Sequence, residues 1–89
     1  MLTGPDSVRF MRPVAVAARG PLVYIADAGL GRLFSYDTSI DRLRVVMELK
    51  GVVRGEVSDI YVAPDLSFYL ADTDGGRVLH FDRDGALIK

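Results

Sequence analysis

Two stretches of this sequence, 45 residues apart, decide its fold. They read Tyr24-Ile25-Ala26-Asp27 and Tyr69-Leu70-Ala71-Asp72, and after a short turn each is followed by a Gly-Arg pair, Gly31-Arg32 and Gly76-Arg77. When residues 13–44 are laid over residues 58–89 at this spacing, seven positions are identical and no gap is needed. Self-similarity at a fixed period indicates a repeat architecture. A period of about 45 residues is the length of a four-stranded propeller blade.

Each copy consists of short apolar runs separated by turn residues. Helix formers are scarce, with two Glu, two Lys and no Gln against eleven Val and eight Phe or Tyr residues. β-Branched and aromatic residues favour strands, and the Gly and Asp residues between the runs suit tight hairpins. The strands expected in the first copy span residues 14–18, 22–26, 32–36 and 42–49, and those in the second span residues 57–63, 67–71, 77–81 and 86–89.

The sequence therefore predicts an all-β chain of four-stranded antiparallel blades, an incomplete propeller of nearly two blades. Residues 1–12 form a leader, residues 13–56 the first blade, and residues 57–89 a second blade whose fourth strand is incomplete. The first two strands of the first blade are apolar on both faces, which predicts that both are covered on both sides. The fourth strand mostly alternates apolar and charged residues, as expected of a wetter outer strand.

Composition excludes several classes of protein. The 89 residues include no Cys, so disulfides, thiolate metal sites and a cysteine nucleophile are ruled out. The net charge of −1 argues against nucleic-acid binding, which favours a strongly basic surface. No apolar run approaches the roughly 20 residues of a membrane helix, so membrane insertion is not expected. His80 is the only histidine and is expected to lie on a strand, partly buried, on the face opposite Leu79 and Phe81.

The repeated motif resembles the NHL repeat. That family combines a Pro-led apolar strand, a strand ending in Ala-Asp, a turn, and a strand that begins with Arg and ends in an aromatic residue and Asp. Residues 13–37 match this pattern, and residues 69–82 match it again, although Ser58-Asp59 stands where the leading proline is expected. The resemblance covers nearly all of residues 8–89. It implies a propeller fold and says little about activity, because similar propellers include sensors, protein scaffolds, RNA binders and a lyase.

Two blades leave large apolar sheet faces uncovered, and closed propellers have about 4–8 blades. The expected partners are therefore proteins, either further copies of this chain or other propeller blades. The segment before the first strand is a candidate for completing a neighbour's unfinished blade, and a frayed leader is the alternative. The candidate assembly residues are Val8, Phe10, Leu87 and Ile88.

Four polar residues recur at matched positions of the two copies. They are Asp27 and Arg32 in the first copy and Asp72 and Arg77 in the second. An Asp at a strand end accepts hydrogen bonds from the backbone N–H groups of a turn and pairs with an Arg across the hairpin. Because catalytic residues break repeat symmetry, we expect these four residues to be structural. The Asp-rich turns after residues 72 and 82 lack the complete pattern of a calcium loop.

The residues that break the repeat are the candidates for ligand contacts at the rim and channel mouth. Asp59 stands where the first copy has Val14, and four charged residues lie in the segments that enter each first strand: Arg12, Lys50, Arg54 and Glu56. Ordinary solvated loop charges are the alternative interpretation. No catalytic constellation, cofactor motif or metal-ligand set is found in the sequence.

The function expected is a non-catalytic binding or scaffold module within a propeller completed by other copies or by further chain. Two alternatives remain open. The chain could be part of a propeller enzyme, a lyase or lactonase-like hydrolase with a channel metal, for which Asp59 is the visible ligand. It could instead be a purely structural subunit of an extracellular or envelope assembly. The aromatic residues at repeat-matched positions are expected to pack between blades rather than to stack on bases; they are Tyr24, Phe34, Tyr36, Phe68, Tyr69 and Phe81.

Overall fold

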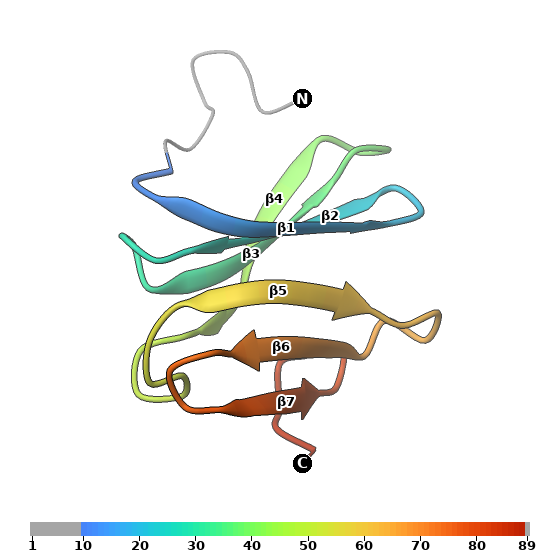
Figure 1. Cartoon of the computed structure of the whole chain (residues 1–89). Coiled ribbons are helices and arrows are strands. Elements are labelled where there is room, and N and C mark those ends of the chain that lie inside the picture. The colour runs from blue at the N-terminus through green and yellow to red at the C-terminus, as the bar shows by residue number, and fades with distance from the viewer. Residues whose placement is uncertain (1–9, 89) are drawn as a thin grey trace.

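The computed structural model describes residues 10–88, which form two antiparallel β-sheets and contain no helix (Figure 1). No helix capable of spanning a membrane is therefore present in this part of the chain. The all-β class predicted from the sequence is confirmed. The first sheet contains β1 (Pro13–Arg19), β2 (Leu22–Asp27), β3 (Arg32–Asp37) and β4 (Arg42–Glu48), and the second contains β5 (Val57–Val62), β6 (Phe68–Asp72) and β7 (Arg77–Phe81).

Every pair of hydrogen-bonded strands consists of chain neighbours, so both sheets are simple meanders. The hairpins that join β2 to β3 and β6 to β7 are built alike. Gly31 and Gly76 occupy equivalent turn positions with φ of +68° and +64°, where a side chain would be strained. Asp27 pairs with Arg32 and Asp72 pairs with Arg77 in the strand register. The 45-residue repeat is thus exact for these strands.

The repeat is not exact for the first strand of each sheet, where the structure corrects the gap-free alignment. Pro13 pairs with Asp27 and Val57 pairs with Asp72, so β1 and β5 are related by 44 residues rather than 45. The extra residue lies in the β5–β6 loop, which has three residues between the pair Ala63 and Ser67 where the β1–β2 loop has two. Leu66 lies in this longer loop and adopts a positive φ of +71°, which accommodates the additional residue. Asp59 is therefore equivalent to Ala15 and not to Val14, and the identity of Ala18 and Ala63 has no structural meaning.

The two sheets pack face to face, with β1 lying beside β5 (Figure 1). Tyr24, Ala26 and Leu33 are buried on the inner face of the first sheet. They share one core with the inner face of the second sheet, which contributes Ile60, Val62, Phe68, Leu70, Leu79 and Phe81. The rings of Tyr24 and Phe68 lie 5.9 Å apart. Alternation along each strand explains the choice of residues, since every second side chain points to this core.

The sequence predicts that the first two strands of the first sheet are covered on both sides, and the structure differs from this for β1. Val16 of β1 is 60% exposed, because β1 is an edge strand and no sheet covers its outer face among the described residues. The expected aromatic packing between sheets holds for Tyr24, Phe68 and Phe81. Phe34 and Tyr36 are instead buried on the outer side of the first sheet, and Tyr69 lies half-buried on the outer side of the second.

Of the candidate assembly residues, Phe10 lies at the opposite end of the structure from Leu87 and Ile88. The ring of Phe10 meets that of Phe34 edge-on at 5.2 Å, so Phe10 contacts its own sheet. Leu87 forms an isolated bridge with Phe81, and the Ile88 N–H donates to the His80 carbonyl oxygen at 2.7 Å. These two residues begin a fourth strand beside β7 but do not complete one. Val8 lies outside the described residues.

Replacing Phe68 by alanine should destabilise the chain strongly, because Phe68 is fully buried at the centre of the contact between the sheets. We expect a loss of about 3–5 kcal/mol in the free energy of unfolding, as for other large core truncations. Denaturant titration monitored by circular dichroism measures the change. The variant Ile40→Ala is the control, since Ile40 lies exposed in the β3–β4 turn and should change stability by less than about 1 kcal/mol. Equal effects of the two substitutions would contradict the assigned core.

Candidate functional site: a charged cavity at the rim of the two sheets

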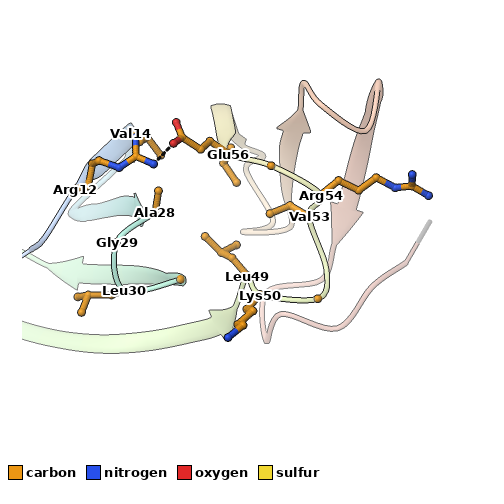
Figure 2. Close-up of a pocket in the computed structure, with 14 residues that line it drawn as sticks. Arg12, Val14, Ala28, Gly29, Leu30, Leu49, Lys50, Val53, Arg54 and Glu56 are labelled. Carbon is orange, nitrogen blue, oxygen red and sulfur yellow. Dashed lines mark hydrogen bonds and ion pairs between the residues drawn. The ribbon is translucent and has the colours of Figure 1, made fainter.

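A cavity of about 630 Å³ opens where the chain enters the first strand of each sheet. Its walls come from the residues around the start of β1, from the β2–β3 turn and from the connection between β4 and β5 (Figure 2). Four glycines line it, Gly29, Gly31, Gly51 and Gly55, so much of the wall is bare backbone. The volume lies within the range of roughly 300–1,000 Å³ that is typical of small-molecule sites.

Four of the five rim residues predicted from the sequence line this cavity: Arg12, Lys50, Arg54 and Glu56. Arg12 forms an ion pair with Glu56 across the entrance to β1 and β5. In Figure 2 the side chains of Lys50 and Arg54 point away from this pair. The lining therefore holds three cationic side chains and one anionic one. The Arg12–Glu56 pair is exposed, and it links the segments that enter the first strand of each sheet.

Asp27 anchors one wall of the cavity. It is fully buried at the end of β2, and its carboxylate accepts the backbone N–H groups of Met11 at 2.8 Å, Arg12 at 3.0 Å and Leu30 at 2.9 Å. Burial alone would raise the pKa of the Asp27 carboxyl, but these N–H groups and that of Gly29 outweigh it and hold the pKa below its ordinary value. The carboxylate thus fixes the backbone that carries Arg12 against the turn after β2.

Asp72 anchors the opposite wall in the same way. It is fully buried at the end of β6, and it accepts the N–H groups of Arg54 at 2.9 Å and Gly75 at 3.1 Å. The pKa of the Asp72 carboxyl is lowered mainly by the Arg54 N–H, with further contributions from Gly75 and the Arg77 guanidinium that outweigh the effect of burial. Each repeat therefore uses its aspartate to hold the backbone of one cationic cavity residue.

The arginines that follow these aspartates behave differently in the two repeats. The Nε of Arg77 lies 3.3 Å from the Asp72 carboxylate, and its Nη2 donates to the Val52 carbonyl oxygen at 2.8 Å. Arg32 instead pairs across the β3–β4 ladder with Glu48 at 3.1 Å and makes no hydrogen bond to Asp27. The pairing of Asp and Arg across the hairpin is thus found in the second repeat only. The difference follows from β4, which supplies a carboxylate that the second sheet lacks among its described strands.

Asp59 does not belong to the cavity. It lies exposed on β5 on the outer face of the second sheet, and its carboxylate accepts the N–H of the adjacent Ile60 at 2.9 Å. Among residues 10–88 no group of three or more His, Cys, Asp and Glu side chains is arranged to hold a metal ion. The one-residue difference in repeat length places Asp59 there, so the sequence comparison assigned it to the wrong position.

The outer face of the second sheet contains a feature that the sequence reasoning missed. Tyr61, Tyr69 and His80 lie directly opposite one another on β5, β6 and β7. The rings of Tyr69 and His80 are stacked at 4.0 Å, and Tyr61 is 56% exposed. The Nε2 atom of His80 is buried and has no hydrogen-bond partner among the described residues. Alternation placed His80 on this face, but finding the row required the corrected register of β5.

Comparison with known protein families, with curated proteins and with solved structures finds no match to this chain.

The buried aspartates should make the protein sensitive to acid. A carboxyl whose pKa is lower in the folded state contributes stability that is fully present above its unfolded pKa of about 3.9 and is lost as the pH falls through the folded value. We expect Asp27→Asn and Asp72→Asn to be less stable than the wild type near pH 7, and we expect the difference to shrink below about pH 4. Thermal unfolding measured across this pH range tests the expectation.

The matched control is Asp84→Asn, because Asp84 is exposed in the turn after β7. It should follow the wild-type profile. If all three variants showed the same dependence of stability on pH, the N–H groups around Asp27 and Asp72 would not be lowering the pKa values of these carboxyls.

Proposed function

We propose that this chain is a non-catalytic binding and scaffold module that contributes two NHL-like blades to a β-propeller completed by other copies or by further chain. The support is architectural. Each sheet is a meander whose strand order follows the chain, and the two sheets stack through opposite faces with their first strands adjacent. Radially stacked sheets of this kind are the building principle of propellers.

The observation on which the proposal chiefly rests is that no second sheet lies on the outer face of either sheet among the described residues. The outer side of the first sheet exposes Val16 at 60% and Val45 at 42% on its two edge strands, while Ile25 and Phe34 between them are buried. The outer side of the second sheet exposes Val78 at 63% and Tyr61 at 56%. Exposed apolar residues on one face of a small protein suit an interaction site. The two outer faces are thus suited to receive further sheets.

The cavity at the rim supports the binding part of the proposal. It lies where segments from both repeats meet, and the two buried aspartates hold the backbone of two of its cationic residues, Arg12 and Arg54. A ligand bound there would contact both sheets, so binding would also stabilise their packing. The enzyme alternative depends on Asp59 as a metal ligand, and no observation on the described residues raises it above the scaffold role.

The proposal is tested by the mass of the native particle. We expect the purified chain at micromolar concentration to form an assembly larger than its 9.7 kDa monomer, because association covers the exposed apolar faces. Static light scattering coupled to size exclusion measures this mass, and it should fall on dilution. A cooperative, folded monomer at every concentration, with no affinity for other propeller blades, would contradict the proposal.

A further inference from the structure

The contact between the two sheets is a template for a second contact. It joins unlike surfaces: the inner face of the first sheet presents Tyr24, Ala26 and Leu33, and the inner face of the second presents Ile60, Leu70 and Leu79 as one row across its strands. Each surface has an equivalent on the opposite side of the other sheet. These equivalents are the two outer faces, and the corrected register identifies their residues one by one.

The outer face of the second sheet, here called the tail face, repeats the inner face of the first. Tyr69 and Ala71 stand where the first sheet has Tyr24 and Ala26, and Val78 stands where it has Leu33. The remaining positions of the tail face are Asp59, Tyr61 and His80. A surface that is buried by a sheet in the first repeat is therefore present, nearly unchanged at its centre, but uncovered in the second.

The outer face of the first sheet, here called the head face, repeats the inner face of the second. A single row crosses its four strands and contains Val16, Ile25, Phe34 and Val45. The first three correspond to Ile60, Leu70 and Leu79, which form the buried row of the second sheet. Inside the chain, the inner face of the first sheet packs against such a row. The tail face repeats that inner face, so the head face is a surface on which a tail face can pack.

We infer that the tail face of one copy docks on the head face of a second copy, repeating the contact already present inside the chain. The inference rests on the proposed assembly and specifies its geometry. Val78 of one molecule would lie against the row of Val16 and Val45 of the next, and the pair would keep one free head face and one free tail face. Such a head-to-tail contact is heterologous, so it produces a ring if the rotation between copies closes and an open filament if it does not.

Phe10 competes with this docking. Its ring packs edge-on against Phe34, at the centre of the row that the incoming sheet would cover. Docking therefore requires Phe10 to leave that position, and its removal should favour association. The substitution Phe10→Ala consequently has an effect opposite in sign to that of substitutions on the two faces.

The test places one charge on each face. Val78→Asp disables the tail face and Val16→Asp disables the head face, at positions exposed enough to leave the monomer folded, which circular dichroism verifies. Val78 and Val16 correspond to Leu33 and Ile60, which the contact inside the chain buries, whereas Asp59 corresponds to the partly exposed Ala15. Because an unpaired charge is costly to bury, each variant alone should associate at least about 100-fold more weakly than the wild type. Mixed together, they should form a 1:1 dimer that grows no further, because one intact head and one intact tail remain.

The controls separate this inference from the proposed assembly. Ile40→Asp adds the same charge at an equally exposed position, 62%, outside both faces and should assemble like the wild type. Phe10→Ala should assemble more tightly. Dimers formed by either face variant alone would indicate contact between like faces and overturn the head-to-tail geometry, as would failure of the mixture to associate. A wild-type chain that stays monomeric would instead overturn the proposed assembly itself.

Discussion

The packing of one pleated face against another is the interaction on which the rest of this structure depends. The largest fully buried side chains include Tyr24, Leu33, Phe68, Leu70 and Phe81, and all of them belong to the core between the two sheets. Each contributes roughly 1.5–3 kcal/mol by leaving water. A meander of three or four strands cannot bury both of its faces by itself. The partner sheet therefore makes each hairpin stable.

The buried aspartates link this core to the cavity. Asp27 and Asp72 end strands that cross the core, yet their carboxylates bind the backbone of segments that precede β1 and β5. The carboxylates stay ionised although they are buried because backbone N–H groups surround them. The positions of Arg12 and Arg54 are consequently set by backbone bonds. Their side chains remain free to differ in direction, as they do here.

Much of this arrangement was readable from the sequence. The alternation of apolar residues and the Gly and Asp turns locate all seven strands to within one or two residues, because both signals are local. Arg12, Lys50, Arg54 and Glu56 line one cavity, and they were grouped from the sequence because they lie in the segments that enter the first strands. The sequence did not give the correct alignment of the first strands of the two repeats. The additional residue in the β5–β6 loop leaves no mark that a gap-free comparison detects, so Asp59 was matched to Val14 and the row on the tail face was missed.

The consecutive order of the strands has a consequence for how the chain reaches its native state. Every hairpin closes between neighbours, over loops of a few residues, and such closures take about 1–10 μs. Contacts between the two sheets, such as that of Tyr24 with Phe68, join positions more than 40 residues apart. The rate-limiting step of folding is thus expected to be the docking of the two sheets after their hairpins have formed. Turn residues such as Gly31 and Gly76 would govern the speed of the early steps, and core residues such as Phe68 would mainly determine how long the native state persists.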